Sequence, residues 1–507
     1  MLSRRLLKYK PHHANVARIY CHHSPRHARL YSNQANKGSL SSRTVVPLAA
    51  GAAGLAIGLY QNRKRDEAPN PRSRDHPDLE GGKTIPDLNK LGLSDQIAYS
   101  PPPTADEVTQ QLNEGAWSHP ETKFAAVSRY DGAQLASNSP CEDAYLHGTF
   151  TNPFGDGDWM AWAVFDGHCG WQLSNLLTKQ LMPFVRRALG DIKHGGKGEV
   201  PEDAIHAALK STFTTLDDSL VQSAAAIIES DLSFPEKARR LEAAYAGACA
   251  LLALFDPGSR NLTVASTGDC RAVLGRRSAD GSWDTTELTV DQTGANPDEV
   301  ARIQARFPDE PNIVQGGRIW GMQPSRTFGD GMWKWPSELK RTLRRYYNGL
   351  SLPSSVRYKD YKDGPYLTAE PAVNTVRIPD AQPSLLILAT DGLWDTMTSA
   401  EAVDLVGRWI DWQAAAGPQA APVRPASSSD FGPTILGWEQ QCKYEESRAT
   451  LQDTNAAVHL MRNGLGGANE EMVRGALTFR YPNSRDIRDD ITVQVVFFNP
   501  KSAGSSK

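Results

Sequence analysis

W159-M-A-W-A-V-F-D-G-H-C-G170 is the most informative segment of this chain, because seven apolar residues end abruptly at Asp166. The run is too short for a core helix and is bounded by turn residues, so it predicts a β-strand that is buried on both faces. Three further apolar runs lie directly beside an acid, and they are N261-L-T-V-A-S-T267 before Gly268-Asp269, S384-L-L-I-L-A-T390 before Asp391, and I491-T-V-Q-V-V-F-F498 after Asp489-Asp490. The sequence therefore predicts several buried strands that carry a carboxylate at one end.

Alanine-rich stretches with helical character lie between these strands. They cover residues 202–226, 236–247 and 399–412, and Thr398 with Glu401 forms a capping box before the last of them. Strands interspersed with long helices, with tight glycine turns inside strand pairs, favour a layered fold with largely antiparallel sheets. The order of elements thus predicts one large α+β body.

The carboxylates beside the strands are the first indication of chemistry. A single Asp-Gly pair is most often an exposed turn, but Asp166-Gly167 and Asp391-Gly392 follow runs that are predicted to be buried. A carboxylate at such a core boundary needs a counter-charge, because desolvation otherwise raises its pKa. No matching Lys or Arg accompanies these acids, which implies a bound cation. Carboxylate and carbonyl oxygens suit Mg²⁺ or Mn²⁺ better than zinc.

Composition excludes several classes of protein. The 507 residues are 40% apolar and 22% charged, which is unlike a collagen, a polytopic membrane protein or a mainly disordered chain. The six cysteines show neither C-x-x-C nor zinc-like spacing, which indicates a reducing compartment without structural disulfides. The net charge of −3 conceals an asymmetry, since residues 1–65 hold twelve Lys/Arg and no acid, whereas the remainder holds 43 basic and 58 acidic residues.

The basic leader requires its own interpretation. Residues 1–42 are rich in Arg, Ser and His, which is typical of a mitochondrial transit peptide, with a disordered nucleic-acid-binding arm as the alternative. Residues 43–62 contain a candidate single-pass membrane anchor, for which a cleavage or linker region is the alternative. Residues 63–118 are predicted to form a linker with a short helix around 105–113, and the folded body is predicted to cover 119–500. The acidic surplus of that body argues against a nucleic-acid partner.

Six motifs occur in order along the body, and they are N138-S-P-C-E-D143, D166-G-H-C-G170, S266-T-G-D-C-R271, S325-R-T-F-G-D330, A389-T-D-G-L-W-D395 and R488-D-D-I-T492. Together they resemble the motifs of the metal-dependent serine/threonine protein phosphatases of the type 2C, or PPM, family over roughly residues 119–499. Within that family, the branch of mitochondrial pyruvate dehydrogenase phosphatases is the most similar. Three segments resemble the pattern of this branch, and they are G321-M-Q-P-S-R-T-F-G-D-G-M-W-K-W335, L135-A-S-N-S-P-C-E-D143 and D453-T-N-A-A-V-H-L-M-R-N463.

The resemblance implies a four-layer αββα sandwich, in which two antiparallel sheets are flanked by helices and a two-metal site lies at one end. It implies that Asp166 bridges two Mg²⁺ or Mn²⁺ ions and that Gly167 offers its carbonyl to one of them. Asp391 and Asp489 are expected to hold the other ion.

The resemblance also assigns the remaining polar residues of the motifs. Glu142 and Asp143 are expected to orient metal-bound waters, and Asp269 is expected to join Asp391 around a weaker third ion. A metal-activated water is expected to attack the phosphorus of phosphoserine or phosphothreonine. His168 is expected to protonate the leaving alkoxide, with a structural loop histidine as the alternative.

One position departs from the family pattern. Asn138 stands where many members carry an arginine that binds the substrate phosphate, and the pyruvate dehydrogenase phosphatase branch also lacks that arginine. Arg129 and Arg326 are candidate replacements, with structural ion pairs as the alternative. In the pair Asp489-Asp490, the first acid aligns with the metal ligand and the second takes a position that is often Asn.

The resemblance implies a phosphorylated mitochondrial protein as the substrate, such as the alpha subunit of pyruvate dehydrogenase, and a location in the mitochondrial matrix or inner membrane. Residues 331–365 are basic and aromatic-rich and fall where the family places a mobile flap, so we expect a docking surface there, with a solvated helix face as the alternative. Residues 413–450 are predicted to be a loop insertion. A pseudophosphatase that acts as an adaptor is the alternative, but it would be expected to lack Asp166, Asp391 or Asp489. A glycoside hydrolase fits less well, because it needs two acids that flank a sugar cleft.

Overall fold

The computed structural model describes residues 103–124, 126–193, 200–344, 361–416, 421–423 and 442–500. The expected transit peptide (1–42), the candidate anchor (43–62) and most of the expected linker (63–118) lie outside these residues. Among the helices that the structure describes, none is long and apolar enough to cross a membrane.

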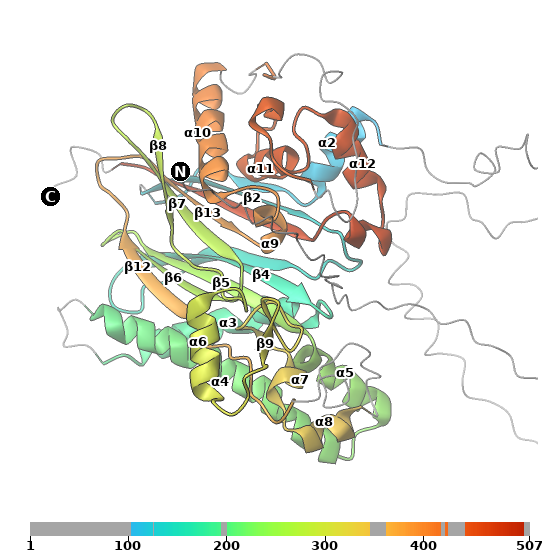
Figure 1. Cartoon of the computed structure of the whole chain (residues 1–507). Coiled ribbons are helices and arrows are strands. Elements are labelled where there is room, and N and C mark those ends of the chain that lie inside the picture. Colours follow the sequence, from blue (N-terminus) through green and yellow to red (C-terminus); the bar gives the residue numbers. More distant parts are fainter. Residues whose placement is uncertain are drawn as a thin grey trace, which may run out of the picture. The chain divides into compact units, whose positions relative to one another are not determined.

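Two antiparallel sheets that face each other form the centre of the domain (Figure 1). The first sheet has the order β1-β2-β14-β13-β7-β8, and its strands are β1 (Trp117–His119), β2 (Val127–Leu135), β14 (Ile491–Phe498), β13 (Ser384–Ala389), β7 (Arg271–Arg277) and β8 (Trp283–Glu287). The second has the order β12-β6-β5-β4-β3 with β11 paired to β5, and its strands are β12 (Ala372–Arg377), β6 (Asn261–Thr267), β5 (Gly247–Asp256), β4 (Asp158–His168), β3 (Ala144–Thr151) and β11 (Phe328–Gly329). A separate ribbon pairs β9 (Val314–Gln315) with β10 (Arg318–Ile319).

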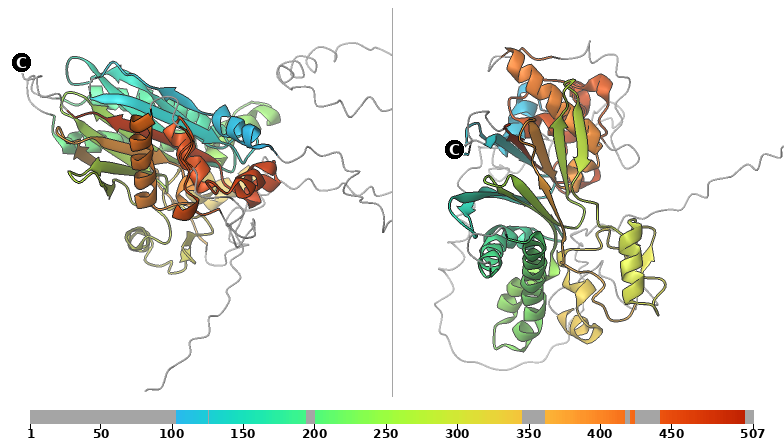
Figure 2. Two further views of the ribbon diagram at one scale, coloured as in Figure 1. Left: turned by 90° about the horizontal axis from the view of Figure 1, so that it is seen from above. Right: turned by 90° about the vertical axis from the view of Figure 1, so that its left-hand side faces the viewer.

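Helices cover the outer face of each sheet, so the domain has the four αββα layers that were predicted (Figures 1 and 2). The helices on the side of the first sheet are α2 (Ala105–Glu114), α9 (Asp391–Trp394), α10 (Ser399–Ala416), α11 (Ala456–Gly464) and α12 (Glu470–Thr478). Those on the side of the second sheet are α3 (Gln172–Gly190), α4 (Glu202–Glu229) and α5 (Phe234–Tyr245). The remaining short helices are α6 (Pro297–Arg306), α7 (Gly331–Lys334), α8 (Ser337–Leu343) and the 3-10 helices η4 (Glu446–Arg448) and η5 (Asn483–Asp486).

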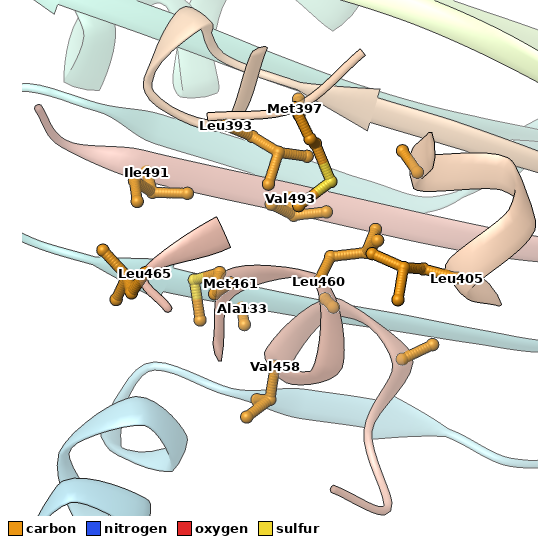
Figure 3. Packing of buried hydrophobic residues seen from close by; sticks show 14 of the residues in the cluster. Ala133, Leu393, Met397, Leu405, Val458, Leu460, Met461, Leu465, Ile491 and Val493 are labelled. Atoms are coloured by element: carbon orange, nitrogen blue, oxygen red, sulfur yellow. The ribbon is translucent and has the colours of Figure 1, made fainter. Parts of the chain in front are cut away.

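The central strands are buried on both faces, as their unbroken apolar runs predicted. Along β13, Leu385 and Ile387 pack toward the helices, whereas Leu386 and Leu388 pack between the two sheets. Figure 3 shows the helix-side cluster, in which Met461 of α11 and Val493 of β14 are among the labelled side chains. Each such side chain contributes about 1.5–3 kcal/mol through burial, so the two-sided strands fix the sandwich and the position of their ends.

The three predicted helices are confirmed. Residues 202–226 lie within α4, residues 236–247 largely coincide with α5, and residues 399–412 lie within α10. The capping box before α10 is also formed, since the Thr398 backbone N–H donates to Glu401 Oε2 at 2.7 Å and the Glu401 N–H donates to Thr398 Oγ1 at 3.3 Å.

The folded body begins earlier in the chain than residue 119. The short helix expected around 105–113 is α2, and its Val108 and Leu112 are buried in the core on the side of the first sheet. The Arg474 Nε donates to the Pro103 carbonyl at 2.6 Å, which fastens the start of α2 to α12. The described part of the expected linker is therefore packed structure, because its two apolar side chains complete the helical layer.

The described parts of residues 331–365 do not form the expected aromatic docking surface. Trp333, Trp335 and Tyr361 are buried at 5%, 2% and 5% exposure in a cluster with α4 and α5. Lys334 is equally buried, and its Nζ lies 2.6 Å from the Asp217 carboxylate. The expectation was wrong for these residues, since their aromatic rings build a satellite core beside the second sheet. Residues 345–360 lie outside the described part of the chain.

Candidate metal centre

Three aspartates from different strands converge at one edge of the sandwich. Asp166 lies in β4, Asp269 follows β6, and Asp391 begins α9 directly after β13. Each offers one carboxylate oxygen, and these three oxygens all lie within 4.8 Å of one another. β4 and β6 belong to the second sheet and β13 to the first, so the stacking of the sheets brings the three carboxylates together.

Antiparallel pairing explains why Asp143 reaches the same edge. Ala144 pairs with Phe165, so the residue before β3 lies opposite Asp166 of β4. Asp143 is buried, and its Oδ2 accepts hydrogen bonds from the hydroxyls of Thr390 at 2.9 Å and Thr492 at 2.7 Å. The two hydroxyls come from the ends of β13 and β14, and they hold this carboxylate against the first sheet.

The electrostatics of the cluster favour a bound cation. Burial is the main cause that raises the pKa of Asp166, and the neighbouring Asp391 and Asp143 raise it further. Burial and the Asp269 carboxylate raise the pKa of Asp391 to about 7. Among the described residues, no Lys or Arg forms an ion pair with any of the four aspartates. Divalent cations would relieve this repulsion.

The chemistry of the donors fits Mg²⁺ or Mn²⁺ and not zinc. One sulfur contacts the cluster through a hydrogen bond, since the buried Cys249 thiol donates to Asp269 Oδ1 at 3.2 Å. Burial and the Asp269 charge raise the pKa of this thiol well above its ordinary value, so it stays protonated and is not a thiolate ligand. The remaining donors are carboxylate and carbonyl oxygens, which are the ligands of hard cations.

Both Asp-Gly pairs of the centre have a steric reason for the glycine. A Cβ on Gly167 would lie 2.1 Å from the Glu142 carbonyl oxygen, and a Cβ on Gly392 would lie 2.1 Å from the Asp490 carbonyl oxygen. Neither glycine has a positive φ, and β4 continues in register through His168. The glycines therefore provide room for a neighbouring backbone, and Asp166-Gly167 lies within a strand and not in a turn.

Of the adjacent acids Asp489 and Asp490, the second is the buried one. Asp490 is 3% exposed, and its two oxygens accept from the backbone N–H groups of Ser137, Asn138 and Glu142. Asp489, the predicted ligand, has a side chain that is 36% exposed and ion-paired to Arg485. The structure thus brings Asp166, Asp269 and Asp391 together but places the Asp489 carboxylate with an arginine.

His168 has a partner that the sequence did not identify. Its Nε2 lies 2.8 Å from Oδ2 of Asp330, a residue that is fully buried and has a left-handed backbone with φ 48°. A Cβ on Gly247 would lie 2.0 Å from that same Nε2, so only glycine leaves space for the pair. Asp330 lies in the S325–D330 motif, but nothing in a linear sequence places it beside residue 168.

The segment around Asp330 is anchored to α4. Asp217 Oδ1 accepts from the Gly329 N–H at 2.7 Å, and its Oδ2 accepts from Lys334 Nζ at 2.6 Å. The Asp330 N–H donates to the Ala246 carbonyl at 2.9 Å. These bonds explain the spacing of the F328-G-D-G-M-W-K334 motif, since one acid on a helix binds both ends of it.

The two arginines that were candidates for binding phosphate form structural ion pairs. Arg129 Nε donates to Asp131 at 2.8 Å, and its guanidinium lies 5.1 Å from the ring centroid of Trp409. Arg326 donates to both carboxylate oxygens of Glu299. Neither is placed to replace the arginine that is absent at position 138.

The sequence matches the family model described as Protein phosphatase 2C over residues 134–423. The chain belongs to this family. A protein phosphatase 2C homologue of Schizosaccharomyces pombe is 36% identical over 408 residues, which cover 79% of this chain and 87% of that protein. The mitochondrial pyruvate dehydrogenase (acetyl-transferring) phosphatase 1 of Saccharomyces cerevisiae is 32% identical, with 79% of this chain and 73% of that protein covered. The human mitochondrial pyruvate dehydrogenase (acetyl-transferring) phosphatase 2 is 30% identical, with 75% of this chain and 79% of that protein covered.

Glu299, the partner of Arg326, generates a prediction on pH dependence. Burial raises the pKa of Glu299, but hydrogen bonds from Arg326, Arg302 and Ser325 outweigh burial and lower the pKa from 4.5 to about 2. A lowered folded-state pKa contributes stability above the unfolded value, and this contribution is lost as the pH falls from 4.5 toward 2. We expect Glu299→Gln to lower the free energy of unfolding by about 3 kcal/mol at neutral pH, with a difference from the wild type that shrinks in that window.

Urea unfolding at a series of pH values measures this difference. Asp411→Asn is the matched control, because it removes an exposed carboxylate that lies 2.7 Å from Arg277, and a pair of this kind contributes about 0–1 kcal/mol. A Glu299→Gln deficit that stays constant down to the acid transition would contradict the assignment.

Proposed function

We propose that this chain removes phosphate from phosphoserine and phosphothreonine side chains of proteins, with Mg²⁺ or Mn²⁺ held at the acid cluster. The observation that supports this most is the convergence of Asp143, Asp166, Asp269 and Asp391, with no Lys or Arg ion-paired to them within the described residues. Family membership supports the same chemistry.

Each residue that we propose to hold a cation offers an oxygen atom at the sandwich edge. Two ions would be held by Asp166, the Gly167 carbonyl, Asp391 and Asp489. Glu142 and Asp143 would act through metal-bound waters, and Asp269 with Asp391 would hold a third ion. For Asp489 this requires that its carboxylate exchange Arg485 for a cation. When bound, two such cations lower the pKa of a water toward neutrality and offset the negative charge of the phosphoryl oxygens.

His168 and Asp330 are proposed to handle the proton of the leaving group. The Asp330 carboxylate lies 2.8 Å from Nε2, so it accepts that N–H and favours the positively charged imidazolium by attraction. The proton on Nδ1 of that imidazolium is then the one delivered to the departing seryl or threonyl oxygen. A side chain that delivers a proton in this way contributes about 10²- to 10⁴-fold to the rate.

The metal requirement gives the first test of this function. We expect Mn²⁺ or Mg²⁺ to activate hydrolysis of a phosphothreonine peptide, EDTA to abolish it, and Asp391→Asn to lower it by at least about 100-fold. Since burial and Asp269 raise the pKa of Asp391, the neutral amide removes a repelled charge, and the metal-free variant should be at least as stable as the wild type. Thermal unfolding with and without Mn²⁺ separates loss of metal binding from loss of folding.

Asp411→Asn serves again as the control, because it removes an exposed acid of α10. A wild-type protein that folds, is stabilised by Mn²⁺ and yet hydrolyses no phosphopeptide would favour the adaptor alternative.

The leaving group distinguishes a proton donor from a structural histidine. We expect His168→Ala to lower turnover of a phosphothreonine peptide by about 100-fold or more, because the alkoxide is a poor leaving group. With an aryl phosphate, whose phenolate needs no proton, the loss should be below about 10-fold. Asp330→Asn should show the same asymmetry more weakly, and equal losses on both substrates would refute the assignment.

We further propose that the chain acts in mitochondria on a phosphorylated protein of the pyruvate dehydrogenase complex. Two of its relatives carry the name of mitochondrial pyruvate dehydrogenase phosphatases, at 32% and 30% identity. The acid-free basic leader at residues 1–42 supports the same location, and residues 43–62 keep open an attachment to the inner membrane.

Purified protein and isolated mitochondria test the substrate and the location. We expect the enzyme to dephosphorylate the phosphorylated alpha subunit of pyruvate dehydrogenase at least about 10-fold faster than phosphocasein, as a specific docking contribution of about 1.4 kcal/mol requires. A reporter fused after residue 62 should enter mitochondria, and carbonate extraction then assigns it to matrix or membrane. Equal rates on both proteins would contradict the proposed substrate.

A further inference from the structure

The substrate phosphate needs a cationic partner that position 138 does not supply. Asn138 is already committed, because its Nδ2 donates to Glu142 Oε2 at 3.0 Å and to Asp490 Oδ2 at 2.9 Å. An amide that holds two carboxylates is not placed to bind a dianion. Arg129 and Arg326 are paired with Asp131 and Glu299 elsewhere in the domain.

Arg485 approaches position 138 from another part of the chain. It lies in η5, and the Ser484 hydroxyl of the same helix donates to the Ser137 carbonyl at 2.5 Å. Arg485 Nη1 itself lies 3.4 Å from the Ser137 hydroxyl and also donates to Asp489 Oδ1. The guanidinium is therefore fastened beside the residue that precedes Asn138.

The Arg485 guanidinium is connected to the acid-bearing loop of the centre, because it contacts Ser137 and the next residue, Asn138, binds Glu142 and Asp490. The Arg485 side chain is 23% exposed, which leaves it accessible to a ligand.

The hydrogen-bonding capacity of Arg485 suits a phosphate. Within the described residues, its hydrogen bonds to Asp489 and Ser137 both come from Nη1. A guanidinium has five N–H donors in a planar fork, so Nε and Nη2 remain for a bidentate contact with a phosphoryl group. A cation on Asp489 would withdraw that carboxylate from Nη1 and add a further donor.

We infer that Arg485 binds the phosphoryl group of the phosphoprotein substrate and so replaces the arginine that is absent at position 138. This inference rests on the proposed function, because it deepens the account of the same site. By this inference, Arg485 raises the affinity of the enzyme for its substrate. The alternative is that Arg485 has a structural role and only orients Asp489.

Kinetics of Arg485→Gln separate these two roles. We expect the KM for a phosphothreonine peptide and the inhibition constant of inorganic phosphate to rise between about 10- and 100-fold at saturating Mn²⁺, as the loss of a charge-assisted hydrogen-bonded contact predicts. The Mn²⁺ concentration for half-maximal activation should stay the same or fall, because a positive charge has been removed from the metal centre. Arg485→Lys should be intermediate, since it keeps the charge but not the fork.

Arg377→Gln is the matched control, because it breaks another Arg–Asp pair, in which Arg377 lies 2.6 Å from Asp380. Arg377 pairs with Asn261 at the start of β6, whereas Asp269 of the acid cluster follows the other end of that strand. It should leave both constants unchanged. An unchanged inhibition constant in Arg485→Gln, or a defect confined to a higher Mn²⁺ requirement, would overturn the inference and leave Arg485 as a residue that orients Asp489.

Calorimetric titration of inorganic phosphate into the Mn²⁺-loaded protein keeps this result separate from the proposed function. If the wild type binds phosphate, loses that binding in Arg485→Gln and hydrolyses no phosphopeptide, the proposed function fails and the phosphate site stands. If the wild type hydrolyses phosphopeptide and the variant binds phosphate as tightly as the wild type, only the phosphate site fails. Thermal unfolding of both arginine variants confirms that they are folded.

Discussion

The mutual repulsion of buried carboxylates at the sandwich edge is the constraint on which the site depends. Burial raises the pKa values of Asp143, Asp166, Asp269 and Asp391, and neighbouring carboxylates raise each of these pKa values further. A protein tolerates such a cluster only when rigid surroundings hold it, because the acids would otherwise separate or turn toward water. Strands that are buried on both faces supply that rigidity, because their side chains are close-packed between the sheets on one face and against the helices on the other.

Close backbone packing at glycines then sets the positions of the acids. Gly167 and Gly392 each let a neighbouring carbonyl approach to a distance that no side chain would allow. The carbonyls belong to Glu142, just before β3, and to Asp490, just before β14, so each glycine packs against the start of the neighbouring strand in its own sheet. Gly247 does the same for the pair of His168 and Asp330. At these three positions glycine is needed for its small size, since none of the three has a positive φ.

The sequence predicts what is local and misses what depends on contacts between distant segments. Apolar runs predicted the strands and their burial, and the acids beside them predicted the centre, because antiparallel pairing carries such residues to one edge. Asp330 and Arg485 were missed because their partners, His168 and Ser137, lie far away in the chain. The prediction of a docking surface at Trp333 and Trp335 was wrong, because the sequence of a Trp-rich basic segment is the same whether its rings face solvent or a satellite core.

Two departures from the family pattern are linked by this structure. Position 138 is Asn where many members have Arg, and position 490 is Asp where Asn is frequent. The Asp490 carboxylate needs donors, and the Asn138 backbone and side-chain N–H groups supply two of them. Together the exchanges turn the local charge from positive to negative, which would repel a phosphate. Arg485, which contacts the neighbouring Ser137, is the positive charge that we propose for this place once a cation on Asp489 releases it from that carboxylate.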